Sequence, residues 1–72
     1  MTPAPREVPI SGDMIRLGQL VKLAGLADSG AEARELVQDD LVRVNGEPET
    51  RRGRQLHRGD LVETGGEAVR VA

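Results

Sequence analysis

Four arginines and a single histidine lie within nine residues, in the stretch TRRGRQLHR from Thr50 to Arg58. The whole chain carries 10 basic and 12 acidic residues and a formal net charge of −2, so this stretch is a local exception. Arginine suits phosphate because its planar guanidinium presents paired N–H donors and stays charged at neutral pH. The stretch is therefore a candidate contact surface for a phosphate-bearing ligand, and a solvated loop kept soluble by its charge is the alternative.

The positive charge is confined to the middle of the chain. Residues 1–40 hold four basic and seven acidic side chains, residues 41–58 hold five and two, and residues 59–72 hold one and three. The three segments thus carry formal charges of −3, +3 and −2. Because fields between exposed charges are screened over about 8 Å in physiological salt, a local basic patch can attract a polyanion despite the negative total.

The composition argues against several classes of site. The 72 residues include no cysteine, one histidine and no phenylalanine, tyrosine or tryptophan. We therefore expect no metal site and no cofactor. Ser11, Ser29 and His57 form no nucleophile pattern, so no enzymatic activity and no small-molecule substrate are expected. Without aromatic rings the chain lacks a base-stacking platform, so phosphate contacts and shape should dominate any binding of nucleic acid.

Two short helices are expected in the first half of the chain. Leu17, Leu20, Val21 and Ala24 recur at helical spacing and share one apolar face, with Lys22 pointing nearly the opposite way. A second helix is expected within DSGAEARELVQDD, residues 28–40. The pair predicts a helix-turn-helix.

The second helix carries its own start signal. Ser29, followed three residues later by Glu32, is a capping-box pattern. Ala33, Leu36 and Val37 form the apolar stripe that should face the core. Capping is the main role expected of Ser29, since the cap already uses donors that a phosphate would need.

The second half reads as short strands. Val42 and Val44 alternate with Arg43, which predicts a half-buried strand, and Asn45–Gly46 is a strong signal for a tight hairpin. Pro48 limits the return strand to an edge or an early end.

The arginine-rich stretch should then form a loop, anchored to the core by Leu56. Two further strands are expected at Leu61–Glu63 and around Val69–Val71, each following a glycine-containing turn. The predicted class is α+β, with two short helices packed on a small antiparallel sheet that contains a β-hairpin.

The N-terminal residues read differently from the rest. Three prolines lie within residues 1–9, so we expect a loose segment there, with a short extended piece at Glu7–Ser11, and a single domain at 10–72. There is no signal-peptide pattern and no apolar run near the roughly 20 residues that span a bilayer. A cytoplasmic location, no membrane partner and a monomeric state are the expectations.

The predicted elements and their motifs resemble those of a known family. A leucine-bearing first helix, then DSGAEAR, VRVNG and RGDLV, is similar to the RNA-binding domain named after small-subunit ribosomal protein S-four, also called the alpha-L motif. The resemblance spans about Ile15 to Glu63, and DSG with EAR narrows it to the short stand-alone bacterial members, the YbcJ-like branch. It implies a ribosome-associated module that binds structured RNA, either ribosomal or transfer RNA.

The candidate RNA-contacting residues combine the arginine stretch with basic positions able to face the same side. One departure from the family is Gly30, where many members carry arginine after the serine that begins the second helix; the stand-alone branch often has glycine there. The predicted RNA-binding residues are Lys22, Arg34, Arg43, Arg51, Arg52, Arg54 and Arg58.

Two alternatives to an RNA-binding module remain open. A protein-interaction module could dock the basic loop on an acidic partner or on a ribonucleoprotein, or pair the edge of its sheet with another chain. DNA is the rival nucleic acid, because a helix-turn-helix suggests it. However, Glu32, Glu35 and Asp39 on the exposed side of the second helix would face DNA phosphates unfavourably.

Overall fold

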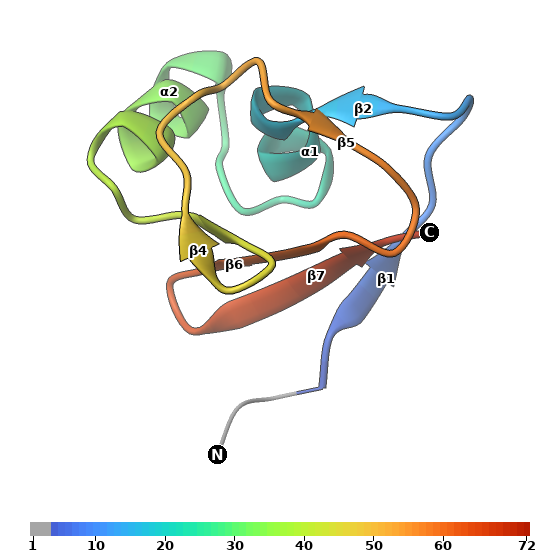
Figure 1. The fold of residues 1–72 in the computed structure, drawn as a ribbon. Helices are drawn as coiled ribbons and strands as arrows, with labels where there is room; N and C mark the ends of the chain where they lie inside the picture. The colour runs from blue at the N-terminus through green and yellow to red at the C-terminus, as the bar shows by residue number, and fades with distance from the viewer. Residues whose placement is uncertain (1–3) are drawn as a thin grey trace.

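The structure, a computed structural model, describes residues 4–72 and consists of two layers, a helix pair lying over a sheet (Figure 1). The expected α+β class is confirmed. The helices are α1 (Leu17–Leu23) and α2 (Gly30–Gln38), and the strands are β1 (Arg6–Val8), β2 (Ile15–Arg16), β3 (Arg43–Val44), β4 (Glu47–Pro48), β5 (Gln55–Leu56), β6 (Leu61–Thr64) and β7 (Glu67–Val71).

The main sheet has five strands in the order β1-β7-β6-β3-β4. The β3–β4, β3–β6 and β6–β7 pairs are antiparallel as expected, but β1 pairs with β7 in parallel, so the sheet is mixed. β1 lies within residues 1–9, the segment that was expected to be loose. Residues 1–3 of that segment lie outside the described part of the chain. Pairing stops before Pro9, which has no backbone N–H to donate.

The core lies between the two layers and is built from aliphatic side chains. Leu17, Leu20 and Val21 on α1 and Val37 on α2 are fully buried, as the helical spacing predicted. Each such side chain contributes about 1.5–3 kcal/mol through removal of its apolar surface from water. Leu36 is only half-buried and packs at the edge of the core.

Side chains and glycine set the helix ends. Ser29 Oγ accepts a hydrogen bond from the Glu32 N–H at 3.1 Å, so Ser29 caps α2 as predicted. The reciprocal bond of a capping box, from the Ser29 N–H to the Glu32 side chain, is absent from the described residues. Gly25 follows α1 with a φ of +74°, a left-handed conformation that favours glycine. Neither helix is long and apolar enough to cross a membrane, and residues 4–72 contain no other helix.

A second, two-stranded sheet was not foreseen in the sequence. β2 and β5 pair antiparallel, with Ile15 opposite Leu56 and Arg16 opposite Gln55. The stretch from Thr50 to Arg58 is therefore not a loop throughout, because its middle is β5. Leu56 is fully buried, so its predicted role as the anchor of this stretch is confirmed.

The Asn45–Gly46 turn does more than reverse the chain. Both residues have positive φ values, +52° and +86°, which is the geometry the pair favours. Asn45 Nδ2 also donates to Asp60 Oδ1 at 3.1 Å, and Asn45 Oδ1 accepts from the Leu61 N–H at 2.9 Å. This bridge explains why an asparagine–glycine turn and a later glycine–aspartate turn occur together in one sequence.

Candidate functional site

A groove lies where α1, the start of α2 and the loop after β4 meet. The loop rises from β4, passes the helices and returns to the sheet pair beside α1 (Figure 1). The groove has a volume of about 400 Å³ and combines three cationic residues with three glycines. Its lining residues are Arg16, Gly18, Gln19, Lys22, Gly30, Ala33, Arg52 and Gly53.

The loop is held against α1 by backbone contacts. Leu17 N–H donates to the Arg54 carbonyl at 2.9 Å, and Gly18 N–H donates to the Arg52 carbonyl at 3.0 Å. The first N–H groups of a helix have no acceptor within the helix, so these carbonyls supply the missing partners. Arg16 Nη1 donates to the Gly53 carbonyl at 2.8 Å, which fixes the loop from the other side.

Gly18 and Gly30 differ in how closely other residues approach them. A Cβ built on Gly18 would lie 3.5 Å from Arg52 Cβ, so the loop packs directly on the first turn of α1. A Cβ on Gly30 would meet nothing within 4 Å, which leaves the N-terminal end of α2 open to the groove. The three cations of the groove thus surround exposed backbone rather than bulky side chains.

Glu49, a buried carboxylate, organises the arginine loop. It is only 6% exposed and lies two residues before Arg51, the first arginine of the loop. Its Oε2 accepts hydrogen bonds from the backbone N–H groups of Thr50 and Arg51 at 3.0 and 3.1 Å. Arg51 adds Nε to Oε2 and Nη2 to Oε1, both at 3.1 Å, and Arg54 Nη1 reaches Oε1 at 3.1 Å. The carboxylate is therefore enclosed by five N–H donors.

These contacts determine the charge state of the carboxylate. The hydrogen bond from the Arg51 side chain is the largest influence and lowers the pKa of Glu49 from 4.5 to about 2, against the opposing effect of burial. The Arg51 backbone N–H and Arg54 add to the lowering. The same pair raises the pKa of Arg51. At neutral pH, Glu49 is charged and offsets part of the positive charge of the loop.

The structure brings only part of the predicted residue set together. Lys22 and Arg52 line the groove, whereas Arg51 and Arg54 turn their guanidinium groups to Glu49. The Arg51 side chain is still 76% exposed, and that of Arg54 is 32% exposed.

The other three predicted residues lie outside the groove lining. Arg58 donates to the Ile10 carbonyl and lies 3.8 Å from the carboxylate of Asp13, a surface pair of small energetic value. Arg43 donates to the Gly46 carbonyl of its own hairpin at 3.3 Å. Arg34 is exposed on α2.

Sequence reasoning missed Arg16 and Glu49. Arg16 directly precedes the apolar stripe of α1. No residue near it in the sequence indicates that its side chain contacts the Gly53 carbonyl, 37 residues further along the chain. The glutamate two residues before a run of arginines was a visible signal, since opposite charges close together in the chain can form a charge-assisted hydrogen bond. Its burial, however, depends on the fold.

Residues 4–72 hold no group of three or more histidine, cysteine or acidic side chains that could bind a metal ion. His57 is exposed, and its backbone N–H donates to Asp60 Oδ2 at 2.8 Å. Burial raises the carboxyl pKa of Asp60, but the hydrogen bonds from the His57 N–H and from Asn45, together with electrostatic attraction that includes Arg54, lower it overall. This histidine–aspartate contact stabilises a turn.

Comparison with known proteins gives one consistent result. The sequence pattern of the S4 domain family matches residues 8–72. The chain is 46% identical over 59 residues to the Bacillus subtilis protein named "Probable ribosome maturation protein RlbA", covering 82% of this chain and 83% of that one. It is 35% identical over 57 residues to the Escherichia coli protein named "Putative RNA-binding protein YbcJ", covering 79% and 81%.

A solved structure shares the fold. The 30S ribosomal protein S4e from Thermoplasma acidophilum superposes with a TM-score of 0.64 at 22% identity, over 83% of this chain and 32% of that protein. The identity is low, so this likeness concerns the arrangement of helices and strands.

Proposed function

Because this chain belongs to the S4 domain family and resembles its short stand-alone bacterial branch, we propose that it is a binding module for structured RNA. The names of the two curated relatives, one for ribosome maturation and one for RNA binding, support ribosomal RNA as the first ligand to test, with transfer RNA as the second. The module acts by binding, without catalysis, as a cytoplasmic monomer.

The single observation that carries this proposal is the convergence of three cations on exposed backbone. Arg16, Lys22 and Arg52 come from three parts of the chain and line one groove that also contains three glycines. Guanidinium and ammonium groups bind phosphate oxygens through charge-assisted hydrogen bonds. The glycines let a sugar-phosphate backbone come close, so contacts to phosphates and 2′-hydroxyls can form without base stacking.

The arginine loop has two roles in this proposal. Arg52 supplies a direct contact, while Arg51 and Arg54 hold the loop in shape through Glu49. The exposed part of Arg51 and the exposed residues Arg58 and Arg34 add long-range attraction for the RNA. Removal of Arg51, Arg52 and Arg54 together would therefore both weaken binding and leave the buried Glu49 carboxylate without its ion-pair partners.

Titration of ribosomal RNA fragments, transfer RNA and duplex DNA of matched length at several salt concentrations tests the proposal. The parent should bind structured RNA more tightly than duplex DNA. The Arg16→Gln and Arg52→Gln variants should each flatten the log–log salt slope by about 0.7 to 0.9, because each removes about one phosphate contact. Glutamine keeps the aliphatic part of the side chain. Arg52→Gln therefore tests the charge alone, whereas Arg16→Gln also loses the hydrogen bond to the Gly53 carbonyl.

Arg70→Gln is the matched control. Arg70 lies between the buried residues Val69 and Val71 on β7, and side chains alternate between the two faces of a sheet. The Arg70 side chain therefore lies on the face of the sheet that points away from the core. This variant removes the same charge and should keep a slope close to that of the parent. Equal slopes for all three variants would show that total charge, and not the groove, governs binding.

A further inference from the structure

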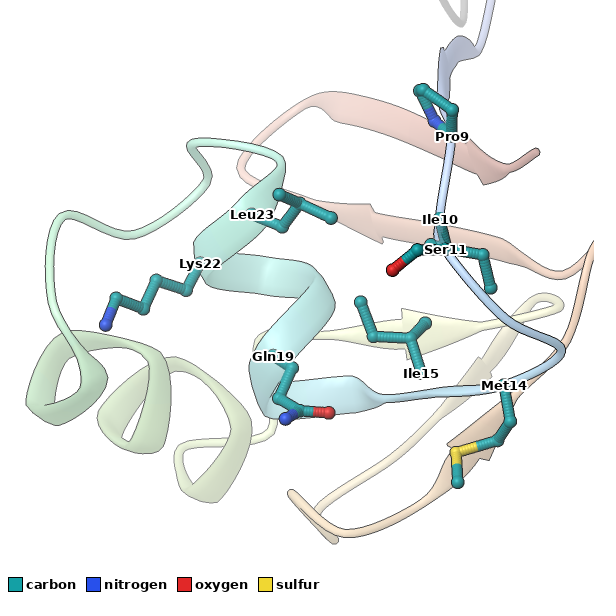
Figure 2. A pocket seen from close by; sticks show the side chains of 8 residues that line it. All are labelled: Pro9, Ile10, Ser11, Met14, Ile15, Gln19, Lys22 and Leu23. Carbon is teal, nitrogen blue, oxygen red and sulfur yellow. The ribbon is translucent and has the colours of Figure 1, made fainter.

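A second groove runs along the other side of α1 (Figure 2). Its walls are mostly aliphatic, and it includes two of the three exposed large apolar residues in the described chain, Met14 at 37% and Leu23 at 57% exposure. The third, Leu41 at 55%, lies elsewhere. The groove is lined by Pro9, Ile10, Ser11, Met14, Ile15, Gln19, Lys22 and Leu23.

The fold holds two of the wall residues of this groove, Ile10 and Ile15, in place. Ile10 donates its N–H to the Ala72 carbonyl at 3.1 Å, and its own carbonyl accepts from Arg58 Nη2 at 3.1 Å. Ile15 pairs with Leu56 across the small sheet, and both isoleucines pack against the core. A preformed apolar groove loses little conformational entropy when it is filled.

The two grooves adjoin each other along α1. Gln19 and Lys22 line both of them. In Figure 2 the Lys22 side chain extends from α1 toward α2, whereas Leu23 points to the other side, toward Ile10. The methylene stem of Lys22 thus borders the apolar groove while its ammonium group serves the basic one.

Gln19 gives the shared rim a polar group with free donors. Its Oε1 accepts a hydrogen bond from the Arg16 N–H at 3.2 Å, which orients the amide. Among residues 4–72, its Nε2 donates to no acceptor. A planar ligand with apolar faces and polar edges matches aliphatic walls next to such donors.

We propose that the apolar groove holds one unpaired nucleobase of the RNA whose phosphates occupy the basic groove. A nucleobase has apolar, polarisable faces and hydrogen-bonding edges, and it is joined to its phosphate through one sugar, so a strand can fill both grooves at once. Met14 supplies a thioether, which interacts favourably with aromatic rings. The proposal rests on the proposed function and adds a ligand class, structured RNA with a bulge or loop rather than an uninterrupted duplex.

Two RNA hairpins with the same stem provide the test, one fully paired and one with a single bulged 2-aminopurine. The parent should bind the bulged hairpin about five- to tenfold more tightly, somewhat less than the effect of stacking on an aromatic side chain. The 2-aminopurine fluorescence should change on binding. Leu23→Ser and Met14→Ser should reduce the preference to about one and abolish the fluorescence change, with the salt slope unchanged.

Leu41→Ser is the matched control, since it removes an equally exposed leucine outside the groove and should keep the full preference. Circular dichroism checks that each variant is folded. Equal binding of both hairpins by the parent, or an unchanged preference in Leu23→Ser, would overturn the base subsite. The titration with ribosomal RNA reports separately on the proposed function, so failure of RNA binding itself is distinguishable.

Discussion

Replacement of Glu49 by glutamine tests how the arginine loop is built. The carboxylate accepts five hydrogen bonds, and glutamine keeps its size but loses its charge and one acceptor oxygen. The amide Nε2 would then face N–H donors of Arg51 or Arg54. We expect Glu49→Gln to lower the free energy of unfolding, because buried polar groups would be left without partners.

The size of the effect follows from the pKa. A fall from 4.5 in the unfolded chain to about 2 in the folded one corresponds to about 3 kcal/mol, at 1.36 kcal/mol per pKa unit. Solvent screens this interaction because the Arg51 side chain is 76% exposed, so we expect about 1 to 2 kcal/mol. Since the folded-state pKa is depressed, this contribution is complete above about pH 4.5 and is lost as the pH falls toward 2.

Urea unfolding followed by far-ultraviolet circular dichroism between pH 7 and pH 2.5 measures this contribution. Intrinsic fluorescence is no use here, because the chain has no tryptophan, tyrosine or phenylalanine. The difference in unfolding free energy between the parent and Glu49→Gln should shrink as the pH falls below about 4.5. Glu47→Gln, an exposed neighbour on β4, is the control and should match the parent. A difference that stays constant down to pH 2.5 would refute the reasoning.

Further predictions concern Gly30 and Asn45. A side chain at Gly30 meets no atom within 4 Å, so Gly30→Arg should add a cation to the groove and steepen the RNA salt slope by about 0.7 to 0.9, while Gly30→Glu should weaken binding. Stability should move the opposite way, with Gly30→Glu more stable than Gly30→Arg by about 0.5 to 2 kcal/mol, because an acidic residue suits the start of a helix. Asn45→Ala should cost about 1 to 3 kcal/mol in urea unfolding, because it loses two hydrogen bonds and keeps a strained positive φ. Asn45→Gly should cost less than Asn45→Ala, since glycine accepts that φ, and equal costs would show that backbone strain has no part.

Most local features of the fold were predictable from neighbouring residues. The buried face of α1, the Ser29 cap and the positive φ at Asn45 and Gly46 all follow from side chains within a few positions. Each depends on helical spacing, a short polar side chain or a turn preference, which act over one turn of chain. The predicted order of two helices and a hairpin-bearing sheet follows from these signals.

The interaction partners of the arginines were not predictable in the same way. The sequence predicted one basic surface of seven residues, but two of them, Arg51 and Arg54, face Glu49, while Arg16 joins Lys22 and Arg52 in the groove. A run of charges specifies that its side chains are polar, but not where they point. The direction of these side chains depends on how the loop is held, and the loop is held by its carbonyl groups, which accept hydrogen bonds from the first N–H groups of α1.

The sequence by itself thus determined the two helices, the Ser29 cap, the Asn45–Gly46 hairpin, the two C-terminal strands and the location of the positive charge, because these depend on residues close together in the chain. Tertiary structure alone decided the parallel pairing of β1 with β7, the pairing of β2 with β5, the burial of Glu49 and the convergence of three cations on three glycines. All of these join segments far apart in the chain. Their geometry is fixed only once the shared aliphatic core has brought those segments together.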